Sequence, residues 1–229
     1  VGLDECVARG AALRSTGHWD ADPTVYTGVG GAAVAYLRAG EFCERARGDV
    51  AAASGFYTKA RDVATACLAA DTRSRFVSFL LGPPGYLAIA CVACSRLGDR
   101  EGAAGHLRGL LAWSEAAAAH TEDEILLGRA GYLYALLWVR SHLGAATADF
   151  DTPLRAVAER LVETGEACAK RICSRSEPWP LLWLCYGEPY VGAAHGVVGV
   201  LAVLLHCYGL LSARSRQLVA DTAARLLRE

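Results

Sequence analysis

A histidine in the last third of the chain is the side chain best suited to proton transfer. His195 lies between Ala194 and Gly196 in the stretch YVGAAHGVVGVLAVLL, residues 190–205. These small neighbours leave its ring free to reach into a cavity. An imidazole titrates near neutral pH, so it could donate or accept a proton there. The other interpretation is that His195 caps a helix or fills a core position, and the residues alone leave both open.

Two carboxylates and an arginine surround an earlier glycine-containing segment. Asp123 and Glu124 come a few residues before the sequence GRAG, residues 128–131, which contains Arg129. A carboxylate close to His195 could orient or charge the imidazole, or bind a cationic group. Arg129 could bind an anionic substrate group. Alternatively, the carboxylates stabilise a helix N-terminus, and Arg129 pairs with Glu124.

The nine cysteines are typical of reduced, buried side chains in a cytosolic protein, so we expect a cytoplasmic location. Most of them lie in apolar helical patterns. Cys91 and Cys94 form a CxxC, but they do so in the helix-forming run LAIACVACSRL with no second CxxC or histidine pair nearby. We predict a buried core pair, and the alternative is a metal or redox pair. The sequence contains no glycine-rich phosphate loop, HExxH or GxSxG.

The composition indicates a globular helical protein. Hydrophobic residues make up 53% of the chain and charged residues 21%, with Ala and Leu dominant, which favours helix over strand. A formal net charge of −1 gives no reason to expect nucleic acid or acidic lipid as a partner. Residues 190–211 could be a membrane span, but their histidines and glycines favour a buried inner helix, so we expect no transmembrane segment.

Four segments share one pattern: a glycine, two residues, a second glycine and then an apolar helix. The glycine pairs are Gly28 and Gly31, Gly82 and Gly85, Gly128 and Gly131, and Gly196 and Gly199. Each gap between the segments holds an amphipathic helix, which indicates an internal repeat of inner and outer helices. The predicted fold class is all-α, an α/α toroid in which apolar inner helices line a ring of outer ones.

Further helices are predicted over residues 3–14, 43–70, 100–119, 153–172 and 212–228, with breaks at Gly48 and Gly55. Two glycines at a helix start allow a tight turn and a close approach of backbones. They are also expected to leave the first-turn N–H groups unpaired at one end of the ring, where a ligand could bind. Close packing without a ligand is the alternative, and it is favoured for any single pair.

In combination, YTGVGG, FLLGPPGYLA, LLGRAGYLYALLWV and YVGAAHGVVGVLAVLL resemble the lanthionine synthetase C-like proteins, above all their eukaryotic branch, over about residues 20–228. The resemblance implies an α/α toroid of seven repeats around a zinc site, with about four repeats in this chain. We therefore expect residues 1–229 to form a single domain, an incomplete toroid. The absence of methionine also indicates part of a longer protein.

The resemblance further implies that the full-length parent adds a thiol to dehydroamino acids in a peptide or protein. The thiol is a peptide cysteine in bacterial cyclases and glutathione in eukaryotic relatives. Zinc would keep the thiol deprotonated, and a general acid would protonate the enolate carbon. His195 matches the histidine of the family's AHG motif, which has that acid/base role, and Glu124 falls where bacterial enzymes carry a catalytic Asp. Asp123 and Arg129 are expected to bind substrate.

The family's zinc ligands lie in a Trp-Cys-His-Gly-type motif and a later Cys-His-Gly, and neither motif occurs in this sequence. The order of motifs in the family places both beyond Glu229. We therefore expect no metal ligand in this chain and no zinc bound by it alone. The alternatives are a non-catalytic relative that binds glutathione or a partner protein, and a different α/α-toroid enzyme such as a glycan-processing one. The last needs carboxylates on opposite walls, whereas Asp123 and Glu124 are adjacent.

Overall fold

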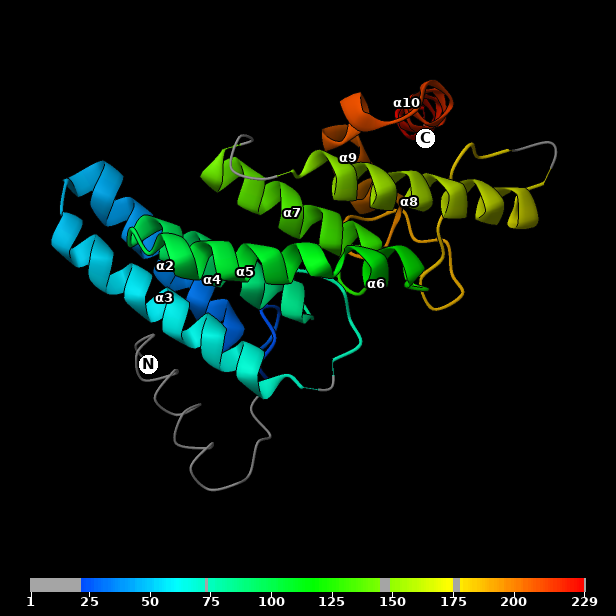
Figure 1. The fold of residues 1–229 in the computed structure, drawn as a ribbon. Coiled ribbons are helices and arrows are strands. Elements are labelled where there is room, and N and C mark those ends of the chain that lie inside the picture. Colours follow the sequence, from blue (N-terminus) through cyan, green and yellow to red (C-terminus); the bar gives the residue numbers. More distant parts are fainter. Residues whose placement is uncertain (1–21, 73, 145–148, 175–177, 229) are drawn as a thin grey trace. The chain divides into compact units, whose positions relative to one another are not determined.

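The computed structural model describes residues 22–72, 74–144, 149–174 and 178–228. Within these ranges the regular structure is helical, and the only β-type pairing is one isolated bridge, so the predicted all-α class is confirmed (Figure 1). The helix predicted over residues 3–14 lies outside the described residues. The chain clusters into two compact units, Val1–Leu110 and Leu111–Glu229. The expectation that residues 1–229 act as one domain stays a prediction.

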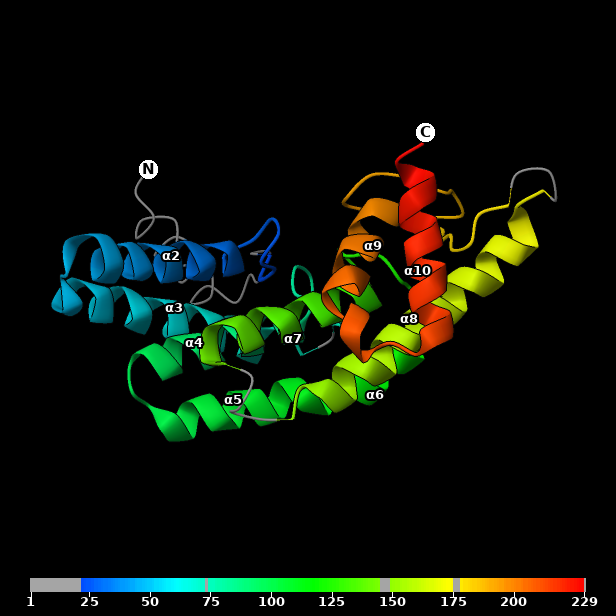
Figure 2. The same cartoon turned by 90° about the horizontal axis from the view of Figure 1, so that it is seen from above.

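The first unit contains α2 (Gly30–Arg47), α3 (Val50–Ala70), α4 (Pro83–Arg96) and most of α5 (Arg100–Ala112). Helices α2 and α3 lie side by side, and α3 also packs against α4 (Figures 1 and 2). Gly48 ends α2 with a φ of 65°, a left-handed conformation that glycine adopts at little cost, and its N–H donates to the carbonyl of Cys43. The break predicted at Gly48 is therefore confirmed, whereas α3 continues through Gly55.

The second unit contains α6 (Ser114–Ala119), α7 (Arg129–Leu143), α8 (Asp151–Ile172), α9 (Val197–His206), the 3-10 turn η2 (Tyr208–Leu210) and α10 (Ala213–Leu226). Helix α7 packs against α8 and α9, and α10 packs against the same two helices. The single helix predicted over residues 100–119 is interrupted at Trp113, between α5 and α6. Helix α9 spans 10 residues, and none of the described helices is long and apolar enough to cross a membrane.

The four glycine pairs lie in four equivalent turns, each at the start of an apolar helix. In every turn the N–H of the first glycine donates to the carbonyl four residues earlier. These bonds join Gly28 to Thr24 (3.2 Å), Gly82 to Ser78 (3.1 Å), Gly128 to Glu124 (3.0 Å) and Gly196 to Gly192 (3.1 Å). The shared geometry supports the internal repeat that the glycine spacing predicted.

These turns require glycine because the preceding chain passes very close to the helix start. A Cβ on Gly196 would lie 2.3 Å from the carbonyl oxygen of Tyr190, and one on Gly199 would lie 1.9 Å from that of Ala193. The other repeats show the same obstruction by the backbone six residues earlier. Gly196 itself has an extended φ of −123° that any residue could adopt. The close approach of two backbones, and not a left-handed conformation, therefore excludes a side chain here.

The first-turn N–H groups at the two helices that start in the second unit's glycine turns are not free for a ligand, so that expectation is wrong there. The N–H groups of Arg129 and Ala130 donate to loop carbonyls at 3.1 Å, and those of Val197 and Val198 do so at 3.0 Å. Because the glycine turn brings the preceding loop over the helix start, the loop itself caps the helix. Helix α4 has fewer first-turn N–H groups that require an acceptor, because it begins with two prolines that carry no N–H.

Replacing Gly196 with alanine tests this explanation. The added methyl group would overlap the backbone of Tyr190, so we expect the variant to be less stable by about 1–3 kcal/mol. The control is Gly55→Ala, because a Cβ on Gly55 inside α3 would meet nothing within 4 Å. That control should gain about 0.5–1 kcal/mol from the better helix propensity of alanine. Urea unfolding followed by circular dichroism measures both, and an unchanged stability for Gly196→Ala would contradict the close approach.

Candidate functional site

The candidate site lies in the second unit, where the turns before α7 and α9 meet. The Oε2 atom of Glu124, in the turn before α7, is 3.2 Å from Nδ1 of His195, the residue before Gly196. The two residues are 71 positions apart in the sequence, and they meet because α7 packs against α9 with equivalent turns at the helix starts. The structure thus brings together the two residues for which a catalytic role was predicted.

The turn before α7 fixes the carboxylate of Glu124. Its side chain is only 1% exposed. Oε2 accepts a hydrogen bond from the N–H of Leu126 at 2.9 Å, and Oε1 accepts one from the N–H of Leu127 at 2.5 Å. Burial raises the pKa of Glu124, and the hydrogen bonds from Leu126, Leu127 and His195 offset that rise only in part. The buried charge of Glu124 therefore gains from an N–H donor such as the imidazole.

His195 is the part of the site that meets solvent, with 36% of its side chain exposed. The rings of Tyr186 and Tyr190 lie beside it, with centroid distances of 6.2 and 6.0 Å. Both of its polar contacts to the described residues involve Nδ1. Nε2 therefore remains for a proton exchange with a bound molecule or water.

A tight turn just before the glycine-rich segment holds one of these tyrosines. Cys185 and Glu188 exchange two backbone hydrogen bonds of 3.0 Å. Between them, Tyr186 has a φ of 53° and Gly187 a φ of 85°, as a two-residue turn of this kind requires. A left-handed tyrosine costs about 1–2 kcal/mol. Such conformations occur at functional positions, and the Tyr186 ring lies beside His195 here.

Cys185 is a site residue that the sequence analysis missed. Its thiol is fully buried, and Sγ is 3.6 Å from Nδ1 of His195. Burial raises the pKa of the Cys185 thiol, and the nearby charge of Glu124 raises it further. The one available signal was its position ten residues before His195, in an irregular loop and not in an apolar helical pattern.

Glu124, Cys185 and His195 together form a group that could hold a metal ion. One ligand atom from each residue lies within 4.8 Å of the other two. A carboxylate oxygen, a thiol sulfur and an imidazole nitrogen are the donors that zinc uses in proteins. The donor set of these three residues therefore fits zinc, although the sequence predicted no metal ligand in this chain.

Asp123 and Arg129, the residues expected to bind substrate, form a buried ion pair with each other. The guanidinium of Arg129 is 3% exposed and donates to Asp123, and also to the carbonyl of Ala118 at 3.3 and 3.2 Å. Arg129 thus pairs with Asp123, and the sequence had suggested Glu124. Burial raises the pKa of Asp123, and the attraction of Arg129 offsets only part of that rise.

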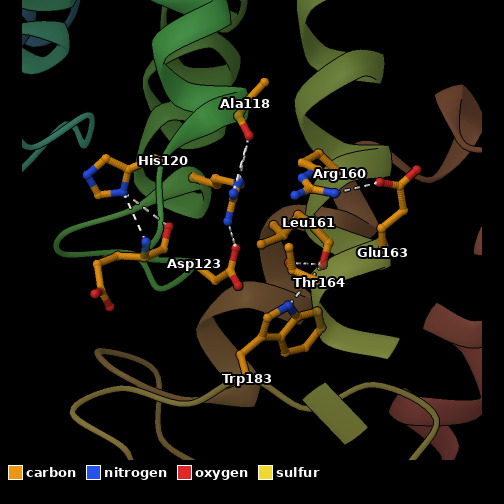
Figure 3. A network of polar contacts seen from close by, with 10 residues as sticks. Ala118, His120, Asp123, Arg160, Leu161, Glu163, Thr164 and Trp183 are labelled. Carbon is orange, nitrogen blue, oxygen red and sulfur yellow. Dashed lines mark hydrogen bonds and ion pairs between the residues drawn. The ribbon is translucent and has the colours of Figure 1, made fainter. Parts of the chain in front are cut away.

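This ion pair borders a pocket of about 530 Å³, and its lining residues include neither Glu124 nor His195. Figure 3 shows Asp123 opposite Thr164 of α8, with Trp183 nearby. The indole N–H of Trp183 is held by the carbonyl of Leu161 at 2.9 Å. The pair links the turn before α7 to the end of α6, and its role in substrate binding stays a prediction.

The CxxC pair lies in the core, as expected. Cys91 and Cys94 are buried in α4, and the thiol of Cys91 donates to the carbonyl of Ala103. Burial raises the pKa of Cys91 to about 12 and that of Cys94 to about 11. Thiols with such pKa values stay protonated at neutral pH, so they are poor nucleophiles.

Comparison with known proteins gives a family match over most of the chain. The family model described as lanthionine synthetase C-like protein matches residues 20–229. The chain is 32% identical over 211 residues to a Danio rerio protein named glutathione S-transferase LANCL1, which covers 90% of this chain and 49% of that protein. It is 30% identical over 194 residues to LanC-like protein GCL1 of Arabidopsis thaliana, covering 81% of this chain and 42% of that protein. The chain thus spans about half the length of these relatives.

Replacing Arg129 with methionine tests whether its ion pair stabilises the second unit. The change leaves the buried carboxylate of Asp123 without its partner, so we expect a loss of about 3–5 kcal/mol at neutral pH. Because the pKa of Asp123 is already raised and the variant removes a lowering influence, the deficit should shrink as the pH falls and Asp123 takes up a proton.

The control for this prediction is Arg160→Met, in the same pocket. Arg160 pairs at 3.1 Å with Glu163, and both side chains are at least half exposed, so the change should cost about 1 kcal/mol or less. Chemical unfolding at several pH values measures both variants. A pH-independent deficit for Arg129→Met, or one no larger than that of the control, would contradict the assignment.

Proposed function

Because the chain belongs to the lanthionine synthetase C-like family, we propose that its full-length parent adds a thiol to a dehydroamino acid and forms a thioether. The thiol donor is glutathione, with a peptide cysteine as the alternative, and the acceptor is a dehydroamino acid in a peptide or protein. The name of the Danio rerio relative, glutathione S-transferase, supports glutathione as the donor. The activity is assigned to the parent because the chain spans 49% of that relative.

The contact between Glu124 and His195 carries this proposal. With its Nδ1–H donating to Glu124 over 3.2 Å, the imidazole presents the lone pair of Nε2 to the site. When Nε2 takes up a proton, the ring becomes an imidazolium, and the adjacent carboxylate stabilises its charge. Glu124 is suited to this role because its own turn fixes both of its oxygens.

The proposed reaction is a conjugate addition. The thiolate sulfur forms a bond to the β-carbon of the dehydroamino acid, and the electrons of the C=C double bond move towards the carbonyl to give an enolate. The Nε2–H of the His195 imidazolium then gives its proton to the α-carbon. The proton lost by the thiol replaces the one that Nε2 has given up. The rings of Tyr186 and Tyr190 beside His195 would supply apolar surface at the reacting carbon.

The family's zinc ligands lie in a Trp-Cys-His-Gly-type motif and a Cys-His-Gly, which do not occur in this sequence. The chemistry that zinc supplies when bound is a thiol held as thiolate at neutral pH. In the proposed reaction, the residues of this chain provide the proton and the surface around it. A cytoplasmic location is part of the proposal, supported by the free thiols of all cysteines in the described ranges.

The proposal predicts that His195→Asn in the full-length parent lowers the rate of thiol addition by about 10²–10⁴-fold, since the proton donor is lost. The variant should still bind zinc at the family's own ligands, which do not include His195. The measurement is a steady-state assay of thioether formation with glutathione and a dehydroalanine peptide, together with metal analysis of each variant.

The matched control is His206→Asn, an exposed histidine at the end of α9, the helix that follows His195, and it should leave the rate near that of the wild type. Glu124→Gln should lower the rate less than His195→Asn and alter its pH profile, because Gln cannot stabilise the imidazolium. An unchanged rate for His195→Asn would overturn the acid/base role. Glutathione binding by the wild type without any addition product would favour a non-catalytic relative.

A further inference from the structure

The three donors of Glu124, Cys185 and His195 converge in a way that hydrogen bonding alone does not explain. Oε2 of Glu124 and Sγ of Cys185 approach the same atom, Nδ1 of His195, at 3.2 and 3.6 Å. In a neutral imidazole that nitrogen carries either one hydrogen or one lone pair. It can therefore donate to the carboxylate or accept from the thiol, but not both at once.

The same geometry argues against a thiol nucleophile activated by a histidine. In such a relay, the imidazole contacts the nucleophile with one nitrogen and its orienting carboxylate with the other. Here one nitrogen faces both groups, and the Cys185 thiol is fully buried. The arrangement leaves no path for a proton to pass through the ring from the thiol to Glu124.

A shared cation would satisfy all three groups at once. For a tetrahedral zinc ion with Zn–N of about 2.1 Å and Zn–S of about 2.3 Å, the nitrogen and sulfur are about 3.6 Å apart, and the nitrogen and a carboxylate oxygen about 3.4 Å apart. The corresponding distances in the structure are 3.6 and 3.2 Å. Both distances to Nδ1 are therefore close to those of a tetrahedral zinc site, and the thiol sulfur and a carboxylate oxygen lie within 4.8 Å of each other.

The charges of the ligand groups and the exposure of His195 are also compatible with a divalent cation. A thiolate and a carboxylate together balance a divalent cation, which removes the cost of keeping Glu124 charged at 1% exposure. His195 is 36% exposed, so the site has an entry path for the ion. Three protein ligands would leave a fourth position for water or another small ligand.

We propose that Glu124, Cys185 and His195 form a binding site for a thiophilic divalent cation, zinc above all, within this chain. The site is distinct from the one formed by the family's Cys-His-Gly motifs, which do not occur in this sequence. On binding, the Cys185 thiol gives its proton to solvent, and the proton on Nδ1 of His195 moves to Nε2 so that the nitrogen lone pair faces the ion. The cation and the hydrogen bond from His195 to Glu124 are thus mutually exclusive.

The test is direct metal binding to the full 229-residue chain after treatment with a chelator. Added Co²⁺, a spectroscopic substitute for zinc, should produce a thiolate-to-metal charge-transfer band at one equivalent, and Zn²⁺ should displace it. Cys185→Ser should abolish the band and weaken Zn²⁺ binding by about 100-fold or more. Glu124→Gln should retain the band but weaken binding, and circular dichroism confirms that each variant is folded.

The controls are Cys94→Ser and Cys207→Ser, which remove buried thiols from other parts of the fold and should keep both the band and the affinity. No thiolate band in the wild type, or a band that survives Cys185→Ser and disappears in a control, would overturn the proposal. These readouts require no enzymatic activity. The proposed thiol addition and this cation site can therefore fail independently.

Discussion

The arrangement of the site depends on the close approach between the first glycine of each turn and the backbone six residues before it. Without a Cβ in the way, the loop folds over the helix start, and its carbonyls accept the first-turn N–H groups of α7 and α9. In the turn before α7, the same fold-back lets the Glu124 side chain accept two further N–H groups. The turn that caps α7 thus also fixes the buried carboxylate of Glu124.

The equivalent turn before α9, in the same unit, positions His195, the hydrogen-bond partner of Glu124. His195 comes directly before Gly196, so the turn before α9 determines where the imidazole lies, and packing of α7 against α9 determines what it meets. Its Nδ1 atom lies between a carboxylate and a thiol. A proton on Nδ1 favours the carboxylate and supports acid/base chemistry through Nε2. A cation on Nδ1 would use all three groups and would remove the imidazole from that role.

The sequence predicted the features that repeat, and it singled out His195 and Glu124, but it missed the contacts that depend on the path of a loop. Glycine spacing and apolar helices revealed the all-α class and the repeated turns, because both follow from local periodicity. The sequence did not reveal that the loop before each helix caps that helix, because capping depends on the path of the loop. The sequence offered an anionic substrate group or Glu124 as the partner of Arg129, whereas the structure pairs it with Asp123. Side-chain pairing of this kind depends on which side of the turn each group faces. Cys185 lay outside every helical pattern, and only the fold brings it to His195.

The acid/base role of His195 requires that Glu124 accepts a hydrogen bond from Nδ1 of His195 in the metal-free chain. The tautomer of His195, read from long-range ¹H–¹⁵N correlations in an NMR spectrum, tests this claim directly. We expect neutral His195 to carry its proton on Nδ1, and we expect Glu124→Gln to reduce that preference. A proton on Nε2 in the metal-free wild-type chain would overturn this hydrogen bond, because the imidazole would then have no Nδ1–H to donate to Glu124.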